Sequence, residues 1–190
     1  MVLPGHIAGG YLATTFILGL SSTPFTTTEL AIIYVVGILA GEIPDLDLLF
    51  FYFNKKNNGT SKKATHRDYI THLPMFWLSL GMTLFLYGYS LNSPLVMTLA
   101  LVLVAGTFSH FILDSIEYGI QWFKPLSHRR ICLFEIKDIA DFEKKSTHNH
   151  VRTGSLLFYW NYVRTIYVRQ ISFYAELLVV IIALVVFFWN

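Results

Sequence analysis

Seven histidine and aspartate side chains stand inside or at the ends of apolar stretches of the sequence. Imidazole and carboxylate groups together suit Zn²⁺, Mn²⁺ or Fe²⁺ better than Cu⁺ or Ca²⁺. Inside a bilayer such groups are costly unless they pair with one another or bind an ion. The candidate metal ligands are His6, Asp45, Asp47, His66, His72, His110 and Asp114.

Two of these carboxylates follow an interruption in an apolar stretch. Asp45 and Asp47 close a segment that begins at Gly41 and contains Pro44. Proline removes a backbone donor and disfavours helical geometry in the residue before it, so a helix is expected to break here. Broken backbone at membrane depth is tolerated only where protein or water satisfies it. The alternative is that the helix leaves the membrane at this point, and the apolar run Leu48–Phe53 argues against it.

His110 and Asp114 are four residues apart within another apolar stretch. Positions i and i+4 share one face of a helix, so the two side chains can grip one ion together. A plain hydrogen-bonded histidine–aspartate pair has the same spacing. This pair therefore indicates metal binding only in combination with the other elements.

The remaining histidines lie where apolar stretches begin. His66 and His72 are six residues apart, about 120° around a regular helix, so both can serve one centre only if His66 lies in the preceding loop. A surface position is the alternative for His66. His6 is flanked by Gly5 and Gly9, which permit close helix approach. Taken alone, His6 is more typical of an interfacial histidine.

The distribution of apolar and charged residues predicts the elements that carry these side chains. The chain has 190 residues, 54% hydrophobic and 14% charged, against about 25% charged in soluble domains. A helical span needs about 20 mostly apolar residues. We therefore predict an all-α, polytopic transmembrane bundle with five spans: Ile7–Leu20, Leu30–Phe53, Ile70–Tyr87, Leu95–Tyr118 and Ile171–Trp189.

The basic residues predict the orientation of the bundle. All 14 Lys and Arg residues lie between Lys55 and Arg67 or between Lys124 and Arg169. Five spans put both regions on one side, which the positive-inside rule makes cytoplasmic, with the N-terminus inside and Asn190 outside. The candidate ligands were not used to derive this topology, yet it brings them all to the cytoplasmic ends of their spans.

The predicted organisation has three parts. Residues 1–125 form a four-span bundle with the metal site, 126–154 a cytoplasmic polar segment, and 155–190 an interfacial helix and the fifth span. His128, His148 and His150 stand beside basic residues and are interpreted as part of the solvated segment. Cys132 is the only cysteine, so an intramolecular disulfide is excluded.

Four short motifs, in this order, resemble the YdjM-type family of bacterial inner-membrane proteins, which are described as metal-dependent hydrolases. They are Gly5-His6-Ile7-Ala8-Gly9, Pro44-Asp45-Leu46-Asp47, Thr65-His66-Arg67 with Thr71-His72, and Ser109-His110-Phe111-Ile112-Leu113-Asp114. The likeness covers residues 1–125. The His66–His72 spacing is one residue longer than the family pattern, which leaves open which histidine is the ligand.

The order of ligands is also similar to the helical superfamily of zinc-dependent phospholipase C and single-strand nucleases. That similarity implies zinc and cleavage of phosphoester bonds. Superfamily members hold three ions, but here Met1 precedes His6 by five residues and no His-x-x-x-Glu follows Asp114. One or two ions are therefore expected, with three as the alternative; zinc is the first choice and manganese or iron the other candidates.

These expectations combine into a membrane-embedded metal-dependent hydrolase, a phosphoesterase for a lipid or lipid-linked substrate. A bound metal lowers the pKa of water and neutralises charge on a phosphoryl oxygen. In this scheme Asp47 takes the water proton and Arg67 binds the phosphate bidentately. The expected partners are the bilayer and this substrate, and no nucleic acid is expected at a membrane-embedded site.

A non-catalytic metal carrier, sensor or transporter is the alternative, because intramembrane His and Asp also form ion pathways. A transport path needs polar residues through the whole membrane, whereas the outer half here is apolar. A purely structural role, in which the polar groups pair with one another, also remains open. The absence of His-Glu-x-x-His argues against a zincin-type protease.

Overall fold

The computed structural model describes residues 3–47, 67, 69–117, 119–134, 160–161, 163–164 and 167–189. Within these residues the structure is helical apart from loops and one isolated bridge between Ile120 and Ile131. His66, His148, His150 and the predicted end of span two, Leu48–Phe53, lie outside the described residues.

The described part contains five long helices and three short 3₁₀ turns. The long helices are α1 (Leu3–Leu20), α2 (Thr27–Glu42), α4 (Pro74–Ser90), α5 (Pro94–Asp114) and α8 (Ile171–Trp189). The 3₁₀ turns are η1 (Ile43–Leu46), η3 (Ile70–His72) and η4 (Tyr167–Arg169). Each predicted span overlaps one long helix, which confirms the all-α class.

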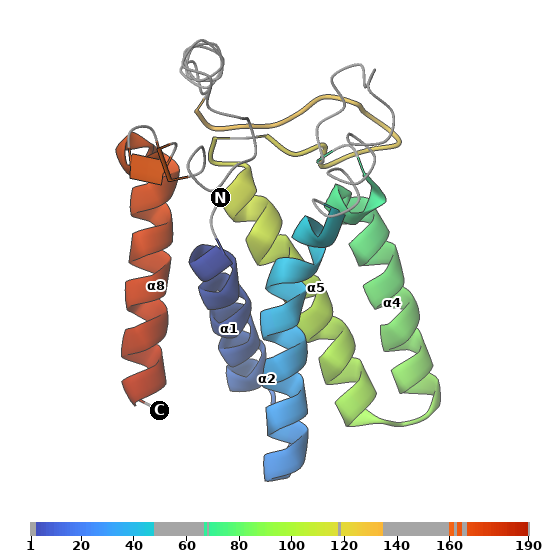
Figure 1. Cartoon of the computed structure of the whole chain (residues 1–190). Coiled ribbons are helices and arrows are strands. Elements are labelled where there is room, and N and C mark those ends of the chain that lie inside the picture. Colours follow the sequence, from blue (N-terminus) through green and yellow to red (C-terminus); the bar gives the residue numbers. More distant parts are fainter. Residues whose placement is uncertain are drawn as a thin grey trace.

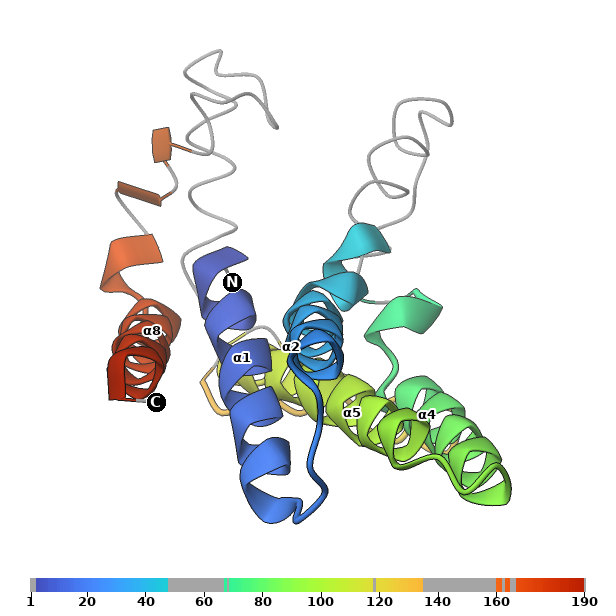
Figure 2. The same ribbon diagram turned by 90° about the horizontal axis from the view of Figure 1, so that it is seen from below.

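The helices are arranged around a central group of three. α1, α2 and α5 contact one another, α4 packs against α5, and α8 packs mainly against α1 (Figures 1 and 2). α5 and α8 are long and apolar enough to cross a membrane, judged by length and composition alone. Most large apolar side chains of α8 are exposed, as is typical of a helix that faces lipid.

Small residues allow the central helices to approach closely. A Cβ atom added at Gly106 of α5 would lie 2.7 Å from the carbonyl oxygen of Gly37 and 2.8 Å from the Cβ of Ala40. At Gly9 of α1 it would lie 3.0 Å from the hydroxyl of Ser109. The expectation that glycines near His6 permit close helix packing is confirmed.

Capping residues at one end of the bundle begin the helices whose other ends carry the candidate ligands. The Thr26 hydroxyl accepts from the backbone N–H of Glu29, whose carboxylate accepts from the N–H of Thr26 at 2.8 Å. At the start of α5 the Ser93 hydroxyl accepts from the backbone N–H of Val96, and Pro94 occupies the first turn. α2 and α5 therefore run in the same direction toward the other end of the bundle.

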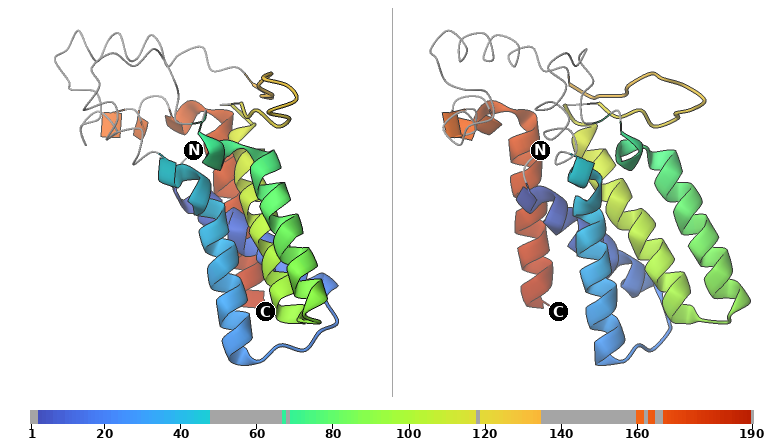
Figure 3. Two further views of the ribbon diagram at one scale, coloured as in Figure 1. Left: turned by 90° about the vertical axis from the view of Figure 1, so that its right-hand side faces the viewer. Right: turned by 45° about the vertical axis from the view of Figure 1, so that its right-hand side comes forward.

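At that other end regular helix gives way to short turns. α2 ends at Glu42 and continues as η1, with Pro44 in its first turn, which confirms the predicted break. η1 contacts η3, which leads into α4 (Figure 3). The indole N–H of Trp77 donates to the carbonyl of Thr71 at 2.7 Å and so holds η3 on the first turn of α4.

A buried carboxylate joins the last helix to the end of α5. Glu117 accepts from the backbone N–H of Ile171 at 2.9 Å and from the hydroxyl of Ser172. These bonds satisfy donors at the start of α8 that have no partner within a helix. The start of α8 is thereby tied to the end of the bundle that bears η1 and η3.

Candidate metal centre

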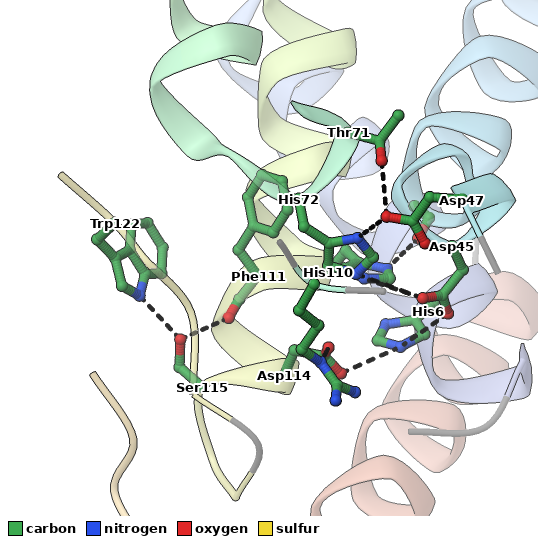
Figure 4. Close-up of polar contacts among 12 residues, drawn as sticks. His6, Asp45, Asp47, Thr71, His72, His110, Phe111, Asp114, Ser115 and Trp122 are labelled. Atoms are coloured by element: carbon green, nitrogen blue, oxygen red, sulfur yellow. Dashed lines mark hydrogen bonds and ion pairs between the residues drawn. The ribbon is translucent and has the colours of Figure 1, made fainter. Parts of the chain in front are cut away.

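Five of the predicted ligands converge from four elements at one end of the bundle. His6 comes from α1, Asp45 from η1, His72 from η3, and His110 and Asp114 from the last turns of α5 (Figure 4). The three histidines and Asp114 are buried, whereas the Asp45 side chain is 20% exposed. Asp45 therefore marks the side of the cluster nearest to the protein surface.

Within each of two sets of three residues, the candidate ligand atoms are separated by distances that one ion can span. His72 Nε2 lies 3.4 Å and His110 Nε2 3.8 Å from Asp45 Oδ1. His6 Nε2 lies 4.0 Å from Asp45 Oδ2 and 3.8 Å from Asp114 Oδ1. Ligands about 2.0–2.1 Å from a tetrahedral zinc ion are roughly 3.4 Å apart. Two sets of three, His6–Asp45–His110 and His72–His110–Asp114, bring their ligand atoms within 4.8 Å of one another.

A backbone carbonyl orients His110. Its Nδ1 lies 2.8 Å from the carbonyl oxygen of Gly41. A carbonyl can only accept, so Nδ1 carries the proton and Nε2 keeps its lone pair toward Asp45. Gly41 is close enough because α2 reaches the end of α5 through the glycine contacts between the two helices.

A carboxylate orients His72 in the same way. Asp47 Oδ2 accepts from His72 Nδ1 at 2.6 Å and from the hydroxyl of Thr71 at 2.7 Å. The Nε2 atom on the other side of the ring faces Asp45 (Figure 4). A metal-binding histidine normally donates its second N–H to such a carboxylate, which fixes the tautomer and the ring orientation.

Arg67 holds Asp114 from the side away from the cluster. Its Nε donates to Asp114 Oδ2 at 2.7 Å, while Asp114 Oδ1 faces His6. Both groups are largely buried, so this pairing offsets part of the cost of burying the carboxylate. The residues predicted as the base, Asp47, and as the phosphate-binding group, Arg67, thus each contact a candidate ligand.

The charge balance of the cluster favours a divalent cation. The rings of His6 and His110 stack with centroids 3.9 Å apart, an arrangement that two protonated imidazoles would oppose. With neutral histidines, the carboxylates of Asp45, Asp47 and Asp114 outnumber the Arg67 guanidinium by two charges. The buried Nε2 atoms of His6 and His110 have no hydrogen-bond partner among the described residues. The residues present therefore fit a divalent metal ion.

Aromatic side chains form an apolar wall on one side of the cluster. Phe111 packs near the rings of His72 and His110, and Trp122 packs against Phe111. The Trp122 indole donates to the Ser115 hydroxyl at 2.8 Å, and that hydroxyl donates to the Phe111 carbonyl at 2.7 Å. Such a wall limits water access and strengthens electrostatic interactions at the site.

Sequence reasoning missed two of the orienting groups. Thr71 had a local signal, because it stands next to His72 in one of the quoted motifs. The Gly41 carbonyl had none, since every residue carries a carbonyl group. Of the other histidines, His66 lies outside the described residues, and exposed His128 belongs to neither set of candidate ligands.

Apolar helices with a buried histidine–aspartate cluster at one end define a helical membrane protein with a candidate metal centre. The family model of the YdjM inner membrane protein matches residues 1–190. The chain therefore belongs to the YdjM inner membrane protein family, as its motifs predicted. Comparisons with curated proteins and with solved structures found no match. The similarity to the phospholipase C and nuclease superfamily stays a prediction.

Proposed function

We propose that the chain is a metal-dependent hydrolase of the inner membrane that cleaves a phosphoester in a lipid or lipid-linked molecule. The observation that carries the proposal is the convergence of five buried or nearly buried candidate ligands. Three of them are also oriented by contacts on the side away from the cluster. Gly41, Asp47 and Arg67 contact the sides of His110, His72 and Asp114 that face away from the cluster. Such outer contacts are expected where a protein orients ligands toward an ion.

The ion would be held by one of the two sets of three among the five convergent residues, with zinc as the first choice and manganese or iron as alternatives. When bound, it would polarise a phosphoryl oxygen and lower the pKa of water. Both sets of three ligands include His110, whose Nδ1 is bound to the Gly41 carbonyl. Only the Nε2 lone pair of His110 remains, and it can bind one ion. The two sets of three therefore cannot each bind an ion with all of their residues. A single shared ion is the simplest occupancy.

The roles of Asp47 and Arg67 follow from their contacts. Asp47 is proposed as a positioning residue, because His72 stands between it and the other ligands. Arg67 is proposed to fix Asp114, with any phosphate contact made by guanidinium nitrogens other than Nε. The partly exposed carboxylate of Asp45 borders the side from which substrate and water would approach.

The substrate class rests on the depth of the site. The ligands come from the ends of α1 and α5 and from turns beside them, at the level where apolar helix meets the lysine- and arginine-bearing segments. In a bilayer this level corresponds to the headgroup region, where phosphoesters of lipids lie. A lipid-derived phosphoester is therefore favoured over a soluble one.

The test uses the full chain in detergent. Its metal content is measured first, and the protein is then loaded with zinc. Wild type, His110→Ala and the matched control His128→Ala are incubated with a bacterial lipid extract and analysed by mass spectrometry. We expect release of a phosphorylated headgroup or phosphate by wild type and by the control but not by His110→Ala, since loss of a ligand removes the metal's contribution to the transition state. Equal product from all three variants would contradict hydrolysis at this metal centre. No product from any of them would contradict hydrolysis altogether.

A non-catalytic metal carrier or sensor is the second candidate, because five protein ligands with little exposure resemble a closed site. It predicts bound metal without turnover. The same metal measurement therefore separates the two: metal-loaded protein that releases no product favours the carrier or sensor.

A further inference from the structure

The segment that follows α5 folds back on itself and is fastened to the bundle. We call residues 119–134 the surface loop. Ile120 and Ile131 exchange two backbone hydrogen bonds of 3.1 and 2.9 Å. The N–H groups of Leu133 and Phe134 donate at 2.9 Å to the carbonyls of Ser115 and Ile116. The loop is thus closed at its base and attached to the turn that ends α5.

Its inward side chains complete this attachment. Ile120 is buried in a cluster with Phe111 and Trp77, and Trp122 packs against Phe108 while its indole donates to Ser115. Because the base is packed into the core, the remainder of the loop is held at a defined height relative to the helices.

The outward side chains combine apolar and basic groups. Leu126 is 84% exposed, Leu133 70% and Phe123 56%. Between them stand Lys124, Arg129 and Arg130, and residues 119–134 contain no Asp or Glu. Exposed leucine and phenylalanine interspersed with basic residues are typical of a segment that lies in a membrane interface.

The position of the surface loop matches that interpretation. It runs across the helix axes at the end of the bundle that bears η1 and η3, and extends over the end of α4 (yellow to orange in Figures 1 and 3). With the long helices in the bilayer, this height is that of the lipid headgroups. It is also the side to which the sequence assigns every lysine and arginine, and therefore the anionic cytoplasmic leaflet.

We propose that the surface loop is a lipid anchor: Phe123, Leu126 and Leu133 enter the headgroup boundary, and its basic residues bind anionic headgroups. The loop then fixes the height of the metal centre, because its base is attached to the turn directly after Asp114. This differs from the expectation of a solvated polar segment for residues 126–134. The anchor does not depend on hydrolysis, so either can fail alone.

The lone cysteine provides the probe. Cys132 is exposed within the surface loop, so a nitroxide label can be attached to it in the full chain without mutation. The labelled protein is reconstituted in vesicles of phosphatidylethanolamine with phosphatidylglycerol, or of phosphatidylcholine alone. Electron paramagnetic resonance then compares collisions with oxygen, which enters the bilayer, and with a water-soluble nickel chelate. A Cys132→Ser, Leu178→Cys variant, labelled on the exposed face of α8, calibrates the bilayer interior.

We expect oxygen collisions to exceed nickel collisions at Cys132, by a larger ratio in the anionic vesicles. Leu126→Asp should lower that ratio at least twofold. Replacing Lys124, Arg129 and Arg130 together by Gln should remove the dependence on phosphatidylglycerol, whereas Arg164→Gln, an exposed basic residue outside the loop, should leave it unchanged. A wild-type label that collides mainly with nickel in both vesicles would place the loop in water and overturn the proposal. Dipolar broadening between labels would assign the surface to a second copy instead, and would equally overturn it.

Discussion

At the scale of single residues, the two carboxylates that flank Leu46 have different surroundings. Asp45 faces the Nε2 atoms of His72 and His110, whereas Asp47 binds the Nδ1 side of His72. The residues lie on a 3₁₀ turn and the residue after it, where three residues complete one turn, so positions i and i+2 point in different directions. Asp45 is thereby placed as a candidate ligand, and Asp47 contacts the far side of another candidate ligand, His72.

This geometry predicts graded effects of two matched substitutions. Asp47→Asn should weaken zinc binding about 10–100-fold, the range for loss of an outer carboxylate partner. Asp45→Asn should weaken it more and should change the absorption spectrum of cobalt-substituted protein, because a ligand atom is replaced. Competition with a chromophoric chelator measures both affinities.

Glu29→Gln is the control for Asp47→Asn, since it makes the same carboxylate-to-amide change at the far end of α2. It should leave the zinc affinity unaltered. A cobalt spectrum altered by Asp47→Asn as strongly as by Asp45→Asn would show that Asp47 is itself a ligand.

Ligation by the three candidate histidines would make the occupancy of the metal site depend on pH. A histidine binds metal only when its coordinating nitrogen is deprotonated, so protons compete with the ion. Affinity should therefore be full at neutral to alkaline pH and should decline as pH falls through the range in which free histidine titrates, about 6.5. Metal analysis after dialysis at stepped pH measures this. His128→Ala, which alters an exposed histidine, should give the same profile as wild type, and a flat profile would argue against histidine ligation.

At the scale of elements, the glycine contacts of α2 and α5 decide whether the ligands can meet. Gly106 lies directly against Gly37 and Ala40, so an added methyl group forces the two helices apart. Such overpacking costs about 1–3 kcal/mol. It should also move the Gly41 carbonyl away from His110.

Gly106→Ala should therefore lower both the thermal stability in detergent and the zinc affinity. Gly19→Ala is the matched control, because a Cβ at Gly19 meets nothing within 4 Å. A scanning fluorescence melt and a chelator titration on both variants measure the effect. If the Gly106→Ala variant matched Gly19→Ala in thermal stability and zinc affinity, the close approach of α2 and α5 would not matter for the centre.

At the scale of the whole molecule, the orientation in the membrane determines which leaflet the metal centre faces. η1, which carries Asp45, and the end of α5 that carries Asp114 lie at the same end of the bundle as the start of α8, and the C-terminus lies at the opposite end (Figure 1). The lysine and arginine distribution predicts that the candidate centre lies on the cytoplasmic side. The C-terminus should then face the periplasm.

Fusions test this assignment. Alkaline phosphatase attached after Asn190 should be active and green fluorescent protein at the same place dark. Fusions after Phe134, which follow four predicted spans instead of five, should give the reverse pattern and serve as the control. A fluorescent fusion at Asn190 together with active phosphatase after Phe134 would move the metal centre and the surface loop to the outer leaflet.

The helical membrane class and the ligand types could be predicted from the sequence. Long uncharged stretches interrupted by isolated His and Asp leave few physical alternatives, because a polar group in apolar surroundings needs a partner. The break at Pro44 was predictable for a similar reason, since proline acts on its own backbone and that of its neighbour. The family membership was also predictable, because its four short motifs occur in the expected order in the sequence.

The tertiary structure alone decided which atoms face one another. From the sequence, Asp47 and Arg67 are ordinary candidates for a base and a phosphate-binding group. In the structure, the packing of η1 against η3 brings Asp47 to His72, and the position of Asp114 brings that carboxylate to Arg67. The spacing of His66 and His72 could not show which of them lies in the cluster, and the structure places His72 there. The direction of a side chain depends on where its helix or turn lies against its neighbours, and that position is set by long-range contacts such as Gly106 against Gly37.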